Sequence, residues 1–364
     1  MRKSMAVLLA LVMIISMFSF VGCDKGSADF VVDVFFYDYT DTYISTVRSS
    51  MKTQLDAMTG VQYTFYDAAS DQAKQTEQVD TALTRGTDLL IVNIVTTGSV
   101  DAAQNIVDAA KEKDVAVIFF NREIADSVVA SYDNCAFVGT DPDEAGYMQG
   151  QMMAEYLLKD ENLATYDLND DKEIAYIMLR GELGNAEAFG RTLYSVQKAN
   201  ELLADSGYTL VPSVANATDN TQPEDGISPY FLYGNWSQAD AKALMDTALS
   251  TYSLTDGSIE LIIANNDDQA LGAIESLKEL NYNKGTAGKF IPVFGVDATS
   301  TAQTAISEGS MVGSIKQDNV AMATGILFFM NNVKAGKNVM AVTTGYNIDE
   351  GVAKIRIPYA IFIG

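Results

Sequence analysis

The sequence contains no histidine. Without it, the chain can form no Ser–His or Cys–His nucleophile and no histidine-ligated zinc or iron site. Carboxylate-based chemistry stays open, because Asp and Glu together account for 48 residues. The missing histidine therefore favours binding over catalysis without excluding an enzyme.

Basic residues are scarce as well. The 24 Lys and Arg residues face 48 Asp and Glu residues, which gives a formal net charge of −24. A surface of this charge repels phosphate backbones, so no nucleic acid is expected as a partner. The acidic residues are spread along the chain, which is typical of a soluble, self-repelling surface. Carboxylates also bind hard cations, so a metal site stays possible.

Long apolar runs are absent after Val21, so no later segment is expected to cross a bilayer. The N-terminus differs. Arg2 and Lys3 precede an apolar stretch over residues 5–21, and small residues lead to Cys23. A basic start, an apolar middle and a small-residue end are typical of a secretion signal.

The end of this segment, Phe20-Val21-Gly22-Cys23, resembles the lipobox of bacterial lipoproteins, with Phe20 where leucine is usual. The resemblance implies a signal peptide over residues 1–22, lipidation of Cys23 and a linker over 23–29. It also implies an extracytoplasmic protein that is lipid-anchored to the outer face of the cell membrane. An ordinary signal peptide and a membrane-anchoring helix are the alternatives.

Cysteine is otherwise limited to Cys135. With Cys23 lipidated, the mature chain could form no intramolecular disulfide. Cys135 precedes the apolar residues 136–138. We therefore expect a buried, inert thiol there.

About 340 residues remain after the signal peptide, which predicts two domains. Apolar strand patterns and helical patterns alternate along the chain, and residues 88–95 are almost wholly apolar, as in a strand covered on both faces. This alternation predicts an α/β fold with doubly wound parallel sheets. Residues 212–235 interrupt it with a loop rich in Pro, Gly, Asn and Asp. The predicted strands are 30–37, 61–66, 88–95, 115–120, 136–138, 173–179, 209–211, 259–264, 291–296, 312–315, 339–346 and 354–361.

Polar side chains follow many of these strands. Because ligands of doubly wound folds bind at the carboxyl ends of strands, these residues are candidates for a cleft between two domains. Aromatic rings together with Asp, Asn and Arg suit a sugar, since rings cover its C–H faces and planar polar groups bind its hydroxyls. Helix capping is the alternative role, and we expect it in part for Thr42, Asp267 and Asp318.

At these positions the chain resembles the type I periplasmic binding proteins, and within them the galactose/glucose-binding proteins. The resemblance covers nearly the whole mature chain, from about Val31 to Tyr359. It implies two doubly wound parallel-sheet lobes joined by a multi-strand hinge, with residues 30–121 and 318–345 in the N-terminal lobe. Residues 122–317 and 346–364 are expected in the C-terminal lobe. The motifs that carry the resemblance are Asp71-Gln72-Ala73-Lys74-Gln75, Phe119-Phe120-Asn121-Arg122-Glu123, Val138-Gly139-Thr140-Asp141, Ile263-Ala264-Asn265-Asn266-Asp267 and Ile291-Pro292-Val293-Phe294-Gly295-Val296-Asp297.

The resemblance also assigns the site. Tyr43 and Trp236 match the aromatic pair that holds the sugar, and Tyr37 matches a tyrosine of the cleft. Four positions depart from the family: Asn185 replaces histidine, Glu187 replaces aspartate, Gln317 replaces asparagine, and Asn235 replaces methionine. The hydroxyl partners implied by position are Asp41, Asn93, Arg191, Asn266 and Asp297.

Residues 167–175 resemble the start of an EF-hand calcium loop, with oxygen-bearing side chains at Asp167, Asn169 and Asp171. Glu173 could contribute its backbone carbonyl. Lys172 stands where the turn glycine is usual, and Ala175 offers no side-chain oxygen. The spacing of the residues alone therefore favours a polar turn over a calcium site. The family resemblance implies a structural Ca²⁺ site here, closed by the distant Glu260.

We therefore expect a lipid-anchored solute-binding protein that captures a monosaccharide of the galactose or glucose type and delivers it to an ABC permease. It is expected to be a monomer that closes its lobes on the ligand, with a chemoreceptor as a further partner. The alternatives are a different sugar (a pentose, a disaccharide or a signalling furanose) and an enzyme that cuts glycosides with a carboxylate pair such as Asp41 and Asp297. A sugar-dependent transcriptional regulator is the third alternative, disfavoured because a signal peptide stands where a DNA-binding segment would.

Overall fold

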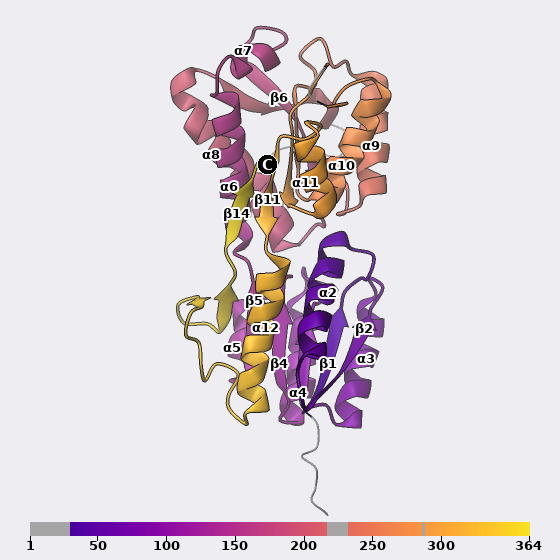
Figure 1. The fold of residues 1–364 in the computed structure, drawn as a ribbon, viewed down its shortest axis with the longest axis vertical. Coiled ribbons are helices and arrows are strands. Elements are labelled where there is room, and N and C mark those ends of the chain that lie inside the picture. The colour runs from indigo at the N-terminus through magenta and orange to yellow at the C-terminus, as the bar shows by residue number, and fades with distance from the viewer. Residues whose placement is uncertain (1–29, 217–231, 286–287) are drawn as a thin grey trace, which may run out of the picture.

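The computed structural model describes residues 30–216, 232–285 and 288–364. The predicted signal peptide, Cys23 and the linker over 23–29 lie outside the described residues, as does most of the predicted loop over 212–235. The described chain forms two lobes along the long axis of the molecule (Figure 1). Of the helices in the described ranges, none is long and apolar enough to span a bilayer.

The first lobe is built on a seven-stranded sheet with the order β12-β13-β5-β4-β3-β1-β2. Neighbours from β2 to β13 pair in parallel, and β12 alone pairs antiparallel, at the edge. The register places Val34 of β1 between Phe65 and Ile91. The strands are β1 (Phe30–Phe36), β2 (Val61–Asp67), β3 (Leu89–Val92), β4 (Ala116–Phe120), β5 (Cys135–Gly139), β12 (Asn347–Ile348) and β13 (Lys354–Arg356).

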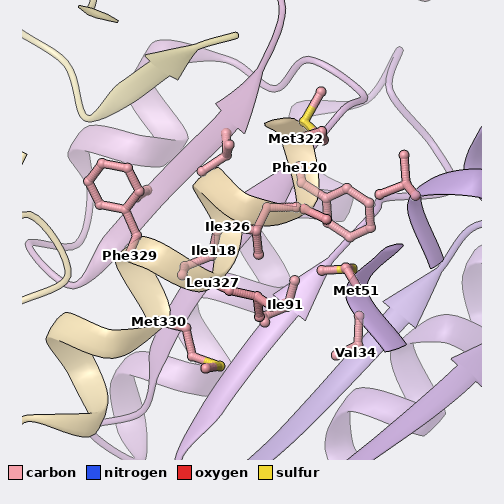
Figure 2. Packing of buried hydrophobic residues seen from close by; sticks show 14 of the residues in the cluster. Val34, Met51, Ile91, Ile118, Phe120, Met322, Ile326, Leu327, Phe329 and Met330 are labelled. Atoms are coloured by element: carbon pink, nitrogen blue, oxygen red, sulfur yellow. The ribbon is translucent and has the colours of Figure 1, made fainter. Parts of the chain in front are cut away.

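Helices cover both faces of this sheet. On one face, α2 (Thr42–Asp56) and α12 (Asn319–Lys334) bring Met51 and Ile326 against Ile91 and Ile118 of the strands (Figure 2). On the other face, α3 (Gln72–Arg85), α4 (Val100–Glu112) and α5 (Asp126–Ala130) enclose a second core. Cys135 lies in that core as a buried free thiol, as predicted, and burial raises its pKa to about 12.

The second lobe repeats the plan, with a sheet in the order β14-β11-β10-β9-β6-β7 and β8 paired to β6. Only β14 runs antiparallel. Its strands are β6 (Glu173–Arg180), β7 (Thr209–Pro212), β8 (Leu232–Tyr233), β9 (Leu261–Ala264), β10 (Val293–Asp297), β11 (Gly313–Gln317) and β14 (Tyr359–Phe362). Its helices are α6 (Pro142–Leu157), α7 (Asn162–Tyr166), α8 (Ala186–Leu203), α9 (Gln238–Thr251), α10 (Asp267–Glu279) and α11 (Ser300–Ser307), with 3₁₀ turns η1 (Ala204–Ser206) and η2 (Val214–Asn216). The predicted fold class is confirmed.

The lobe boundaries differ from the predicted ones. Residues 122–317 were expected in the second lobe, yet β5 pairs with β4 and the first lobe therefore extends through Gly139. The segment 346–364 was expected in the second lobe as well, yet β12 and β13 belong to the first sheet. The predicted strand 354–361 is divided at Pro358, which has no N–H for a ladder, and its two halves join different sheets. Residues 339–346 form turns instead of the predicted strand.

Three segments cross between the lobes: those after β5, after β11, and between β13 and β14. Two of the crossings are joined by hydrogen bonds. The Ile357 N–H donates to the Gly139 carbonyl at 2.7 Å, and the Thr140 hydroxyl donates to the Tyr359 hydroxyl at 2.8 Å. These crossings form the multi-strand hinge that the sequence predicted.

A buried charge network supports the hinge on its first-lobe side. The Lys354 side chain, 3% exposed, donates to the Glu123 carboxylate, to Asp126 at 2.6 Å and to the Ile124 carbonyl at 2.6 Å. Arg356 contacts Glu123 at 2.7 Å as well. Because a buried cation is costly to leave unpaired, this network should hold the crossing segments in place.

Candidate functional site

A cavity lies between the lobes at the carboxyl ends of the strands, where doubly wound folds bind their ligands. We call it the inner chamber. It encloses about 390 Å³ of empty space, which includes the part open to the cleft. Ten of the eleven predicted sugar-binding residues line it, together with three others. The lining residues are Tyr37, Asp41, Tyr43, Ile44, Asn121, Arg122, Asn185, Glu187, Arg191, Trp236, Asn266, Asp297 and Gln317.

Three of the predicted polar residues also cap helices. Asp41 caps α2 and accepts from the Ile44 N–H at 2.7 Å, while Asn185 caps α8 and Asn266 caps α10 through the same kind of bond. The second carboxylate oxygen of Asp41 accepts from the Tyr37 hydroxyl at 2.5 Å. Capping therefore fixes these side chains at the cleft, and it does not compete with a role in binding.

The predicted aromatic pair is drawn from both lobes. Tyr43 comes from α2, is 7% exposed, and has no hydrogen-bond partner for its hydroxyl. Trp236 precedes α9 with a left-handed φ of 64° and lies against Gly181, where an added Cβ would come within 2.4 Å of the indole. The Arg191 guanidinium carbon lies 5.6 Å from the centroid of the Trp236 ring. The indole therefore contacts the backbone at Gly181 and lies near a cation.

Among the described residues, Arg191 is one of two buried cations that line the chamber, the other being Arg122, and 4% of the Arg191 side chain is exposed. Its guanidinium donates to the Asn265 carbonyl at 2.9 Å and to the Tyr359 hydroxyl at 3.0 Å, and lies 3.9 Å from Asp297. Burial alone would lower the pKa of Arg191, but Tyr359 and Asp297 raise it overall. Arg191 is therefore a permanent positive charge that connects the hinge strand β14 to the chamber.

Two acids face this cation. Burial raises the pKa of Asp297, Arg191 opposes the increase, and the neighbouring Asp267 adds to it. Asp297 also has a φ of 112°, a conformation that non-glycine residues adopt mainly where surrounding structure enforces it. Burial raises the pKa of Glu187 too, and one of its oxygens accepts from the Glu123 N–H at 3.0 Å.

Several buried polar atoms of the chamber have no partner. Among the described residues they include donors and an acceptor: Tyr43 Oη, Arg122 Nε, Glu187 Oε2, Arg191 Nε, Trp236 Nε1 and Gln317 Nε2. An unsatisfied buried polar group costs roughly 1–3 kcal/mol, so such a concentration is rare without a ligand to satisfy it. Donors and an acceptor together in one chamber that also contains aromatic rings suit a polyhydroxylated molecule.

Asn93 is the one predicted residue that does not line the chamber. It is fully buried behind the wall, where it accepts from the Tyr37 N–H at 3.3 Å and donates to the Phe120 carbonyl at 3.1 Å. Its amide also donates to Asn121 at 3.3 Å. Asn93 therefore positions Tyr37 and Asn121.

Three lining residues were not predicted: Ile44, Asn121 and Arg122. Asn121 and Arg122 directly follow β4, so their place at a strand end and within a family motif could have found them. Ile44 is apolar and sits on α2, and nothing in the sequence pattern distinguishes it from a core residue.

The lobes touch across the cleft. Arg122 of the first lobe forms an ion pair with Glu182 of the second, and the Thr42 hydroxyl donates to Asp268 at 2.7 Å. Gly98 and Gly184 meet so closely that a Cβ on Gly98 would lie 3.6 Å from the Gly184 Cα. The described lobes are therefore in a closed arrangement.

The predicted calcium loop lies at the start of β6, away from the chamber. The Asp167 carboxylate accepts from the backbone N–H groups of Asp171 and Lys172, each at 3.1 Å. Glu260 is 1% exposed and accepts from the N–H groups of Leu168 at 2.6 Å and Ala175 at 2.8 Å. The five predicted ligands are Asp167, Asn169, Asp171, Glu173 and Glu260.

The donor set fits a hard cation in part. Burial raises the pKa of Glu260 to about 7, and the negative charges of Asp167 and Asp171 add to the increase. Lys172 has the left-handed φ of 67° that favours glycine at this turn. Within the described ranges, no three or more His, Cys, Asp or Glu side chains form a group able to hold a metal. An ion there would depend on Asn169 and backbone carbonyls as well.

Comparisons with known proteins agree with this architecture. The family model described as Periplasmic binding protein domain matches residues 31–338. The D-galactose/methyl-galactoside binding periplasmic protein MglB of Haemophilus influenzae is 31% identical over 346 residues, which cover 93% of this chain and 92% of that protein. Two solved solute-binding proteins share the fold. That of Bacillus halodurans with bound myo-inositol has a TM-score of 0.68 and 22% identity, and the alignment covers 93% of this chain and 96% of that one. That of Clostridium phytofermentans with bound β-D-glucose has a TM-score of 0.68 and 20% identity, covering 92% and 94%.

Proposed function

The chain belongs to the periplasmic binding protein family, as a sugar-binding protein of ABC transporters, and from this premise we propose that it captures an aldohexose of the galactose or glucose type. Members of this family bind solutes for transport and are not enzymes. Their location is extracytoplasmic, and their partner is a membrane permease of the ABC class. The relative at 31% identity is named for galactose and methyl-galactoside, which supports this choice of sugar.

The observation that carries the proposal is the set of unpartnered polar atoms in the inner chamber beside Tyr43 and Trp236. A pyranose has two apolar faces, which the aromatic rings would cover, and a rim of hydroxyls that both donate and accept. Its hydroxyls would satisfy the Glu187 oxygen as donors and the Arg191 and Gln317 nitrogens as acceptors. An apolar ligand would leave these groups buried and unpaired.

The four departures from the family keep a second sugar as an alternative. Asn185 and Gln317 line the chamber and can each donate and accept, so either could favour another epimer or a pentose. The hydroxyl of Tyr43 adds one more polar atom near the ring face. A ligand with a hydroxyl in reach of that atom would be preferred over its epimer.

The test is a binding screen of aldohexoses and pentoses, followed by titration of the best ligand. Trp236 is the only tryptophan of the sequence, so intrinsic fluorescence reports directly on the chamber. We expect Asp297→Ala and Trp236→Ala each to abolish binding, measured by calorimetry, while circular dichroism stays unchanged. Tyr43→Phe serves as the conservative control that removes one hydroxyl. Unchanged affinity in both alanine variants would place the site elsewhere.

We further propose that Cys23 carries lipid and tethers the protein to the outer face of the cell membrane, as a monomer. The sequence Phe20-Val21-Gly22-Cys23 supports this. Fractionation after labelling with a radioactive fatty acid should find the label in the wild type and none in Cys23→Ala. A chemoreceptor is a second proposed partner of the closed form, which pull-down with and without sugar would test.

The calcium proposal rests on the turn at Asp167, where Asp167 and Glu260 both accept backbone N–H groups of the loop and where Asn169 and backbone carbonyls would have to supply further oxygen ligands. Ca²⁺ bound to the folded state alone would stabilise it by mass action. Its role would be structural, because the loop lies outside the chamber.

A further inference from the structure

A second cavity adjoins the inner chamber on the side away from the hinge. We call it the outer chamber. It encloses about 1,240 Å³ of empty space, against about 390 Å³ for the inner one, counted in the same way with the part open to solvent included. Asp38 and Ser70 line it from the first lobe, and Glu182, Tyr233, Ala239 and Asp268 line it from the second.

The two chambers share a wall made of Tyr37, Asp41, Arg122 and Trp236. The lobes already touch through Arg122 and Glu182 and through Thr42 and Asp268, yet the outer chamber persists. The outer chamber therefore provides space next to the inner one while the lobes are closed.

A binding group is placed at the junction. The Arg122 side chain is 5% exposed and lies 4.2 Å over the Tyr37 ring, and its Nη2 donates to the Val95 carbonyl at 2.9 Å and to Glu182. Its Nε–H has no partner within the described residues, and neither does the indole N–H of Trp236. Both atoms are hydrogen-bond donors, so a ligand acceptor such as the bridging oxygen of a glycoside could accept from them.

Charge limits what can occupy the outer chamber. Its walls carry four carboxylates, those of Asp38, Asp41, Glu182 and Asp268. Among the described lining residues the one cation is Arg122, and it is already paired with Glu182. A phosphate or a uronic acid would be repelled there. Hydroxyl groups suit the same walls, since carboxylates, Tyr233 and Gln238 all bind them.

We propose that the ligand class of this protein includes neutral disaccharides, with one hexose in the inner chamber, the bridging oxygen at Arg122 and the second sugar unit in the outer chamber. This rests on the proposed function, because it takes the inner chamber as the hexose site. It extends that function by naming a second subsite and the chemistry that the subsite accepts.

The experiment compares three ligand sets by calorimetry: free aldohexoses, their methyl glycosides together with α- and β-linked disaccharides, and the hexose 1-phosphates. We expect at least one disaccharide to bind within about tenfold of the best monosaccharide, or more tightly, and the 1-phosphates to bind more than about tenfold more weakly. A monosaccharide that binds while every disaccharide fails would overturn the second subsite, whether or not methyl glycosides bind. Failure of all sugars would overturn the proposed function as well.

A matched pair of variants locates the subsite. Ala239 is exposed at the start of α9 and lines only the outer chamber, while Ala243 is exposed one turn later on the same helix and lines neither chamber. Ala239→Trp should weaken disaccharide binding at least about tenfold and leave monosaccharide affinity unchanged, because the indole fills the outer chamber alone. Ala243→Trp should change neither. Equal disaccharide affinity in both variants would overturn the proposal.

Discussion

Arg122 in the first lobe forms an ion pair with Glu182 in the second, across the cleft that separates the two sheets. The Arg122 side chain is 5% exposed and that of Glu182 is 29% exposed, so water screens the pair only in part. The pair exists only when the lobes are closed. It therefore biases the equilibrium toward the closed form that a ligand also selects.

The first prediction concerns this pair. Glu182→Gln should shift the ligand-free protein toward the open form and weaken sugar binding by about three- to tenfold, because closure no longer gains the charge interaction. Small-angle scattering would measure the larger radius of gyration, and calorimetry the affinity. Glu279→Gln, which removes an exposed ion pair to Lys242, is the control and should change neither. A compact ligand-free Glu182→Gln protein with wild-type affinity would contradict the prediction.

The second prediction concerns the backbone beneath the tryptophan. Gly181→Ala should displace the indole of Trp236, because the new methyl group would come within 2.4 Å of the ring. We expect sugar affinity to fall at least about tenfold and the Trp236 emission maximum to move, with circular dichroism unchanged. Gly98→Ala is the matched control, since its methyl group would meet Gly184 at an ordinary 3.6 Å. Equal loss in both variants would point to a general effect of replacing glycine.

The third prediction concerns the hinge network. Glu123→Leu should lower the free energy of unfolding by about 3–5 kcal/mol, because it leaves the buried Lys354 without its main partner. Urea unfolding measures the loss. Asp56→Leu breaks an exposed pair with Lys52 and should lower the free energy of unfolding far less, because water screens that pair. A similar, small cost in both variants would mean that Asp126 alone is sufficient to pair Lys354.

The fourth prediction concerns pH. Burial raises the pKa of Asp267, which accepts from Ser314 at 2.6 Å and from the Thr299 N–H at 2.6 Å. A carboxyl with a raised pKa in the folded state contributes stability that is complete below its unfolded pKa of about 3.9 and is lost as pH rises toward the folded pKa. The ligand-free protein should therefore be more stable near about pH 5.5 than near about pH 7.5.

Denaturant unfolding at several pH values would measure this slope. Asp267→Asn should flatten it, because the amide keeps the shape of the side chain and does not titrate. Burial raises the pKa of Asp297 too, so its titration also lowers stability as pH rises. Part of the pH dependence should therefore remain in Asp267→Asn. A wild-type stability that increases from about pH 5.5 to about 7.5 would contradict the prediction.

The fifth prediction concerns the calcium loop. Millimolar Ca²⁺ should raise the melting temperature of the wild type, and chelation should reverse the change. Lys172→Gly should stabilise the calcium-free protein by up to about 1 kcal/mol, because Lys172 adopts a left-handed φ of 67°, and should strengthen the response to Ca²⁺. Glu260→Gln should remove the response. No shift with Ca²⁺ in either the wild type or Lys172→Gly would count against the site.

Sequence patterns were most informative where local physics decides. Gly86 follows α3 and has the left-handed φ of 92° that ends a helix, so the residue type alone marks this boundary. Polar residues after strands were predicted to meet at one cleft, the family resemblance assigned eleven residues to the site, and ten of the eleven line one chamber. Family motifs supported the same positions, and the family itself is confirmed.

The sequence was less informative where the structure depends on contacts between segments that are far apart in the chain. Cys135–Gly139 looked like the first strand of the second lobe, yet it completes the first sheet by pairing with β4 and β13. Asn93 looked like a wall residue, yet the packing of Tyr37 and Asn121 places it behind the wall. Local secondary-structure propensity predicts neither outcome. Each depends on contacts with strands and side chains that are distant in the sequence.

By itself, the sequence determined the class of fold, the alternation of strands and helices, and the residues that crowd the cleft, since periodicity and strand ends are local properties. Tertiary structure alone decided how the chain crosses three times between the lobes, which polar atoms lack partners, and that a second chamber adjoins the first. These features arise from segments far apart in sequence, such as Arg122 and Glu182, that meet only when both lobes are folded and closed.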